Sequence, residues 1–284
     1  MAVELSKLEQ FVAQALQEDV GDGDHTSLST ISAEARGEAE LLVKDSGILA
    51  GVAVAKDMFH IIDPALQIDV SLEDGTEVKS GDIALFVQGS VHSILKAERL
   101  VLNVMQRMSG IATKTNLYAK QLIGTKSKVL DTRKTTPLLR FLEKEAVHIG
   151  GGVNHRFGLY DMILIKDNHV DYAGGISHAL ACAQAYLKTQ KLAIPIEIEV
   201  RSFQELDEVL ASAHVDRVMF DNFTPAEVER AVKLVNGRLV TEASGGITLE
   251  TIRDYALAGV DFISVGALTH SVKSLDLSLK AKIV

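Results

Sequence analysis

Four basic side chains lie just past the ends of strand-like or glycine-rich segments in the middle of the chain. They are Arg133, Lys134, Arg156 and Lys166. The first two follow an apolar run at 128–130, and Lys166 directly follows another at 162–165. Side chains just past the carboxyl ends of parallel strands point into the crevice where α/β folds bind ligands. Because guanidinium and ammonium groups bind carboxylates and phosphates, the pattern predicts an anion site.

The overall charge of the chain contrasts with that basic cluster. Its 284 residues carry a net charge of -9, with 47% hydrophobic and 24% charged residues. An acidic protein without a polybasic tract disfavours nucleic acid and anionic membranes as partners. No apolar run approaches the roughly 20 residues that span a bilayer, and the N-terminus lacks a signal-peptide core. We therefore expect a cytoplasmic protein with a small polyanionic ligand.

The single cysteine limits the chemistry further. Cys182 excludes an intramolecular disulfide and a cysteine-based zinc site. It lies in a helical-looking run, where we expect a packed thiol.

Two carboxylates also fall at predicted strand ends. Glu199 belongs to the alternating run IEIEV, and Asp221 follows the run RVMF. A carboxylate at the end of a buried strand is costly unless it binds something, and ribose hydroxyls or Mg²⁺ are suitable partners. Glu197 shares the face of Glu199 by period-two alternation, so either acid can be the one that makes the contact.

A run of small residues, EASGGIT at 242–248, predicts a phosphate site. It stands between a predicted strand and a helix N-terminus, where backbone N–H groups can approach a phosphate closely. The next predicted strand leads to Gly266. In complete barrels the loops after the last two strands also bind phosphate.

The pattern of predicted helices and strands changes near residue 128. Before it, short strands at about 37–89, a helix at about 51–60 and a long helix from about 93 to beyond 108 indicate an α+β region. After it, strands alternate with helices, as in an incomplete parallel barrel or an open doubly wound sheet. The predicted strands are 129–130, 162–165, 196–200, 217–220, 239–241 and 262–265. Ser202, Thr224 and Thr248 are the predicted helix N-caps, and Ser6 with Glu9 has the spacing of a capping box at the first helix.

These motifs resemble those of the quinolinate phosphoribosyltransferase family, also called nicotinate-nucleotide pyrophosphorylase (carboxylating). The resemblance rests on DTRKT, GGGVNHR and LIKDNH between residues 131 and 169, and covers almost the whole chain. It extends to EDVGDGDHT (18–26), ERLVLNVMQRMSGIAT (98–113), IEIEV (196–200), MFDN (219–222), EASGGI (242–247) and SVGALTH (264–270).

The resemblance implies both a fold and a reaction. The expected fold is α/β, with an N-terminal α+β sandwich-like domain at 1–112, joined by the tail 271–284. An open, incomplete parallel (β/α) barrel follows at 113–270. The implied reaction, in NAD biosynthesis, transfers phosphoribose from phosphoribosyl pyrophosphate to quinolinate with decarboxylation. Its products are nicotinate mononucleotide, pyrophosphate and carbon dioxide.

The resemblance also assigns roles to residues. The catalytic residues would be Lys134, Lys166, Glu199 and Asp221, the last two also holding Mg²⁺ that arrives with phosphoribosyl pyrophosphate. Arg99, Arg133, His155 and Arg156 would bind the acid, and Ser244, Gly245, Gly266 and His270 the 5′-phosphate. Arg99 lies in an almost wholly apolar helix, and the resemblance implies a homodimer, or an oligomer built of dimers, in which a neighbouring subunit supplies it.

Two alternatives remain on sequence grounds. A related phosphoribosyltransferase acting on a monocarboxylate such as nicotinate would need fewer cations, and a non-catalytic phosphate-ligand-binding homologue would not need the two lysines and two acids together. One residue departs from the family pattern. Leu138 stands where relatives often have glycine, and we expect it to lie where the next helix begins, in which leucine is favourable.

Overall fold

The computed structural model describes residues 3–212 and 215–282, which form two compact units. The first comprises the chain up to Asn116, the segment Thr135–Gly151 and the chain from Leu268 onward. The second comprises Leu117–Lys134 and Gly152–Ala267. Among the described residues, no helix combines the length and apolar character needed to cross a membrane.

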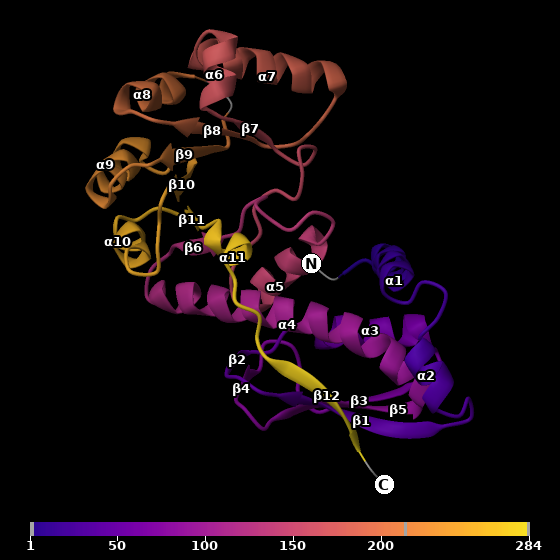
Figure 1. Ribbon diagram of the computed structural model, residues 1–284. Helices are drawn as coiled ribbons and strands as arrows, with labels where there is room; N and C mark the ends of the chain where they lie inside the picture. The colour runs from indigo at the N-terminus through magenta and orange to yellow at the C-terminus, as the bar shows by residue number, and fades with distance from the viewer. Residues whose placement is uncertain (1–2, 213–214, 283–284) are drawn as a thin grey trace. The chain divides into compact units, whose positions relative to one another are not determined.

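The first unit contains a four-stranded antiparallel sheet in the order β12-β1-β5-β3 (Figure 1). The strands are β1 (Arg36–Val43), β3 (Gln67–Val70), β5 (Ile83–Ser90) and β12 (Leu277–Lys282), and β2 (Gly47–Ile48) pairs separately with β4 (Glu77–Val78). Alternate residues of β1 are buried, as expected for a strand with one face on a core. The C-terminal tail supplies β12, paired with β1 from Glu38↔Lys282 to Val43↔Leu277.

Helices complete the first unit. They are α1 (Leu5–Asp19), α2 (His25–Thr30), α3 (Val52–Ile62), α5 (Arg140–Ile149) and most of α4 (Val91–Gln121), whose last residues belong to the second unit. The end of α5 meets α4 closely, because a Cβ on Gly150 would overlap the carbonyl oxygen of Ala112. The predicted capping box is wrong: α1 begins at Leu5, and the hydroxyl of Ser6 donates to Glu4 inside the first turn.

The second unit is a six-stranded parallel sheet in the order β6-β11-β10-β9-β8-β7. Its strands are β6 (Lys128–Leu130), β7 (Ile163–Ile165), β8 (Ile196–Val200), β9 (Arg217–Asp221), β10 (Val240–Ser244) and β11 (Phe262–Ser264). Since β6 and β7 stand at opposite ends of the order, the sheet is open, and the predicted fold class is confirmed.

The helices of the second unit follow the strands along one side of the sheet (Figure 1). They are α6 (Asp167–Ala173), α7 (Ile176–Gln190), α8 (Phe203–Ala211), α9 (Pro225–Val235) and α10 (Ile252–Leu257), and α11 (Ala267–His270) begins where this unit ends. Ser202 and Thr224 cap α8 and α9 as predicted. The prediction for Thr248 is wrong, because α10 starts only at Ile252. The thiol of Cys182 is exposed, so the expected packed thiol is also wrong.

Leu138 lies before α5 and not within it, so the expected helical role is wrong. Its φ is 66°, in the left-handed region, and 82% of the residue is exposed. A non-glycine residue in this conformation is destabilised by contact between its Cβ and the following carbonyl. The glycine common in relatives is therefore explained by backbone geometry.

We expect Leu138→Gly to raise the free energy of unfolding by up to about 1 kcal/mol, because relief of left-handed strain exceeds the added entropy of the unfolded chain. Leu138→Ala keeps the strain and serves as the matched control. Urea unfolding of the three proteins measures the difference. A glycine variant less stable than the alanine variant would contradict this account.

Candidate active site

Alternation along the strands decides which side chains reach the interior of the second unit. On β8, Ile196, Ile198 and Val200 are buried in the core, whereas Glu197 and Glu199 occupy the opposite face. On this face, residues at the ends of the strands line a cavity of about 330 Å³. The described residues that line it are Thr132, Arg133, Lys134, His155, Arg156, Leu164, Lys166, Glu199, Met219, Glu242, Ser244 and Ser264.

The cavity brings together the four cations that the sequence singled out. Arg133 and Lys134 are exposed at its wall, and Arg156 is half-buried. Burial, and next the neighbouring Arg133 guanidinium, lower the pKa of Arg156 from its usual value. Like charges held this close are stabilised by an anionic ligand, which supports the predicted anion site.

Lys166 and Glu199 pair across neighbouring strands. Lys166 follows β7, and its Nζ donates to Glu199 Oε1 over 2.6 Å. The lysine side chain is 47% exposed and the glutamate 10%, so the pair lies at the cavity surface. Of the two acids left open by the sequence, Glu199 is the one that lines the cavity.

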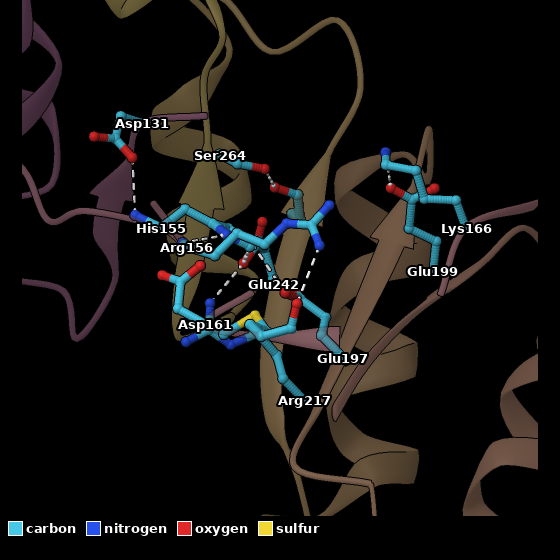
Figure 2. A network of polar contacts seen from close by, with 12 residues as sticks. Asp131, His155, Arg156, Asp161, Lys166, Glu197, Glu199, Arg217, Glu242 and Ser264 are labelled. Carbon is cyan, nitrogen blue, oxygen red and sulfur yellow. Dashed lines mark hydrogen bonds and ion pairs between the residues drawn. The ribbon is translucent and has the colours of Figure 1, made fainter. Parts of the chain in front are cut away.

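Glu197 lies deeper, in a polar cluster with His155 (Figure 2). His155 Nε2 is 2.9 Å from Glu197 Oε2 and 3.5 Å from Glu242 Oε2. Arg217 donates from Nη1 to the same Glu242 oxygen over 2.9 Å. Both glutamate side chains are fully buried, and burial is the main cause that raises the pKa of each to about 7.

Several predicted site residues do not line the cavity. Asp221 ends β9 and accepts a hydrogen bond from Asn222 Nδ2 over 2.9 Å. Gly245 and Gly266 follow the ends of β10 and β11 without forming the wall described above. Arg99 and His270 belong to the first unit, where both are exposed.

The turn after β10 requires glycine. Gly245 has a φ of 101°, and a Cβ there would overlap the side chain of Asn222 and lie 2.9 Å from its backbone nitrogen. The expected contribution of a helix N-terminus is wrong, since α10 begins at Ile252, well after this turn, and is six residues long. Any phosphate here would be bound by the Ser244 hydroxyl and the loop N–H groups.

Sequence reasoning missed part of the wall. Thr132, Leu164, Met219, Glu242 and Ser264 line the cavity without having been assigned a role. Strand alternation could have found Glu242, two residues before Ser244 on the same face, but the motif drew attention to its glycines. The carboxylate of Asp131 was also overlooked, although it is fully buried and accepts the His155 N–H over 2.8 Å.

The arrangement offers electrostatic recognition by four cations, with two acids, Glu199 and the deeper Glu242, in the same wall. Four cations can orient a small polyanion, and Glu199 can stabilise positive charge or hold a cation. We find no nucleophile–base pair among the described cavity residues, so positioning and charge are the catalytic means that this site provides.

Comparison with known proteins identifies the family. The N-terminal and C-terminal domains of quinolinate phosphoribosyl transferase match residues 24–109 and 111–280. "Quinolinate phosphoribosyltransferase [decarboxylating] 1b" of Nicotiana tabacum is 47% identical over 96% of this chain and 82% of its own length. "Probable nicotinate-nucleotide pyrophosphorylase [carboxylating]" of Bacillus subtilis is 44% identical over 96% of this chain and 93% of its own.

A solved structure extends the similarity to three dimensions. NadC from Streptococcus pyogenes superposes with a TM-score of 0.94 at 38% identity, covering 100% of this chain and 99% of that one. Sequence and fold agree over nearly the full length, and the chain belongs to the quinolinate phosphoribosyltransferase family.

Proposed function

We propose that this chain transfers phosphoribose from phosphoribosyl pyrophosphate to the ring nitrogen of quinolinate and releases the 2-carboxylate as carbon dioxide. The products are nicotinate mononucleotide and pyrophosphate, on the route to NAD. The cavity that gathers Arg133, Lys134, Arg156 and Lys166 in an acidic chain carries the proposal. A dicarboxylate and a pyrophosphate ester both need such a concentration of positive charge.

Recognition of the acid falls to the planar cations. Arg133 and Arg156 can each bind a carboxylate with two parallel hydrogen bonds, which fixes the orientation of the ring. Lys134 and Lys166 supply point charges, and His155 belongs to the wall of the same pocket. A second subunit would add Arg99.

The ribose phosphate has a separate proposed site. Ser244 lines the cavity. Gly245 turns the chain there, and because it has no Cβ, no side chain covers the backbone N–H groups of the loop. Together with Gly266, these residues would bind the 5′-phosphate, and His270 is a further proposed ligand of it.

Glu199 and Asp221 are the proposed Mg²⁺ ligands. They end neighbouring strands and offer the hard oxygen donors that Mg²⁺ prefers, so they fit the ion. When bound, Mg²⁺ would neutralise charge on the departing pyrophosphate. Glu199 would also stabilise positive charge developing on the ribose.

We expect quinolinate, phosphoribosyl pyrophosphate and Mg²⁺ to yield carbon dioxide and nicotinate mononucleotide in equal amounts. Nicotinate should be at least about 100-fold poorer in kcat/KM, because it leaves buried arginines without a carboxylate. Comparable turnover of nicotinate would favour the monocarboxylate enzyme. Binding of phosphate esters without turnover of either acid would favour the non-catalytic homologue.

Lys134→Ala and Lys166→Ala should each lower kcat/KM for quinolinate by about 10²–10³, since each removes a fixed charge facing a polyanion. Their circular dichroism should remain native, because Lys134 and Lys166 are exposed and bury no core. Lys188→Ala, an exposed lysine on α7, is the control for loss of charge alone. Activity near wild type in either variant would remove that lysine from the proposed site.

Gly245→Ala should raise KM for phosphoribosyl pyrophosphate by about 10-fold or more, because the new Cβ displaces Asn222 and strains a positive φ. Gly246→Ala, whose Cβ meets no atom within 4 Å, controls for the loss of a loop glycine. Steady-state kinetics of both variants distinguish them. Equal effects would show that the close approach at Gly245 is unimportant.

We further propose a homodimer in which Arg99 completes the acid pocket of the neighbouring subunit. Arg99 is exposed on α4 although Leu100, Val101, Leu102 and Met105 around it are buried. Arg99 shares the exposed face of α4 with Lys96 and Asn103, so its guanidinium is available to a contact outside its own chain.

Arg99→Ala and Lys134→Ala should each be nearly inactive alone and regain activity when their subunits are mixed. One site of a mixed dimer collects both defects and the other neither, so up to about half of the wild-type activity per mixed dimer should return. Isolated heterodimers that remain inactive would place Arg99 in its own chain's site or outside catalysis.

A further inference from the structure

The segment that carries His155 and Arg156 has almost no regular structure to hold it. It connects the first unit to β7, and its one ladder contact is an isolated bridge between Leu130 and Val153. Hydrogen bonds that involve side chains hold this segment instead of strand pairing. The carboxylate of Asp131 accepts the backbone N–H of His155, and Arg156 Nη1 donates to the carbonyl of Met162 over 3.1 Å.

The imidazole of His155 is engaged at both nitrogens. Nδ1 accepts the backbone N–H of Arg156 over 2.7 Å, which leaves Nε2 as the nitrogen that carries the proton. Nε2 is directed at Glu197 and Glu242, at 2.9 and 3.5 Å (Figure 2). Since the side chain is only 6% exposed, the ring presents no unoccupied nitrogen to a substrate.

The two carboxylates reach this ring from different strands. Glu197 is on β8 and Glu242 on β10, with β9 between them supplying Arg217. Among the described residues, neither Glu197 oxygen nor Glu242 Oε1 has a hydrogen bond of good geometry. Buried carboxylates are costly without partners, and Glu197 has the guanidinium of Arg217 nearby and the Nε2 of His155 in direct contact.

We propose that Glu197 and Glu242 are positioning residues for recognition of the acid: they hold the imidazole of His155, which in turn fixes the backbone and guanidinium of Arg156. The inference rests on the proposed function and refines the role of His155, which acts through Arg156. If Arg156 binds a carboxylate equally well before and during the reaction, loosening the support beneath it weakens binding of the acid and leaves kcat unchanged.

A metal ion is the competing explanation for the same cluster. The ligand atoms of His155, Glu197 and Glu242 lie within 4.8 Å of one another, close enough to share an ion. The hydrogen bonds argue against it. Because Nδ1 accepts the backbone N–H of Arg156, Nε2 carries the proton and has no lone pair for an ion, and Oε2 of Glu242 already accepts a hydrogen bond from Arg217.

The test uses Glu242→Gln and Glu197→Gln in the full-length protein. Each amide keeps the shape of the side chain but removes the charge that holds the ring. We expect KM for quinolinate to rise about 10-fold or more, whereas KM for phosphoribosyl pyrophosphate and kcat stay within about 2-fold. The dissociation constant of phthalate, a dicarboxylate without the ring nitrogen, should rise by the same factor when it is measured by calorimetry.

Two further variants complete the design. Glu205, on α8, forms an ion pair with Arg201. Glu205→Gln removes this carboxylate and should leave kcat, both KM values and the dissociation constant of phthalate unchanged. Glu242→Asp keeps the charge and shortens its reach. If the glutamine variants do not fold, Glu242→Asp should still raise the dissociation constant of phthalate by several-fold.

Three results would overturn the inference. They are unchanged quinolinate KM and phthalate affinity in folded variants, an equal loss in kcat and both KM values, and stoichiometric metal in the purified protein that disappears in Glu242→Gln. Failure of the proposed function is seen separately, because then the wild-type protein itself releases no carbon dioxide from quinolinate.

Discussion

Crowded positive charge is the constraint on which the active unit depends. Arg133, Lys134, Arg156 and Lys166 border one cavity, and their mutual repulsion must be offset before any substrate arrives. Glu199 offsets Lys166 at the cavity surface, and the carboxylates of Glu197 and Glu242 lie beneath Arg156. The result is a pocket that remains attractive to anions while no cation is isolated in a low-dielectric surrounding.

The open parallel sheet is what allows two layers of charge. On β8 and β10 the residues of one face are two apart, so each strand contributes a deep carboxylate and a shallower polar group: Glu197 below Glu199, and Glu242 below Ser244. Apolar residues of the opposite face, such as Ile198 and Ala243, pack into the core. The same alternation that buries the core therefore sets the depth of each functional side chain.

The sequence predicted the strands of the second unit well, because buried parallel strands are short apolar runs bounded by turns. IEIEV, for example, matches β8 at both ends. It could not tell Glu197 from Glu199, since both share one face and only the depth of the cavity separates them. The left-handed Leu138 and the late start of α10 were also missed, because backbone conformation outside regular elements depends on tertiary contacts. The likeness to the family suggested catalytic residues but gave no account of what holds them.

The contact between Lys166 and Glu199 carries a consequence for binding. At 2.6 Å the lysine is committed to this acid, yet nearly half of its side chain is exposed, so the ammonium has room to turn toward a ligand. An ammonium has three donors, so Lys166 can keep its contact with Glu199, which is only 10% exposed, while another N–H group turns toward a ligand. Arg156 has no such freedom, because its guanidinium also donates to the carbonyl of Met162 and its backbone is clamped to His155. The pocket thus combines one adaptable cation with one fixed cation, and only the fixed one has a position set by the protein before a ligand binds.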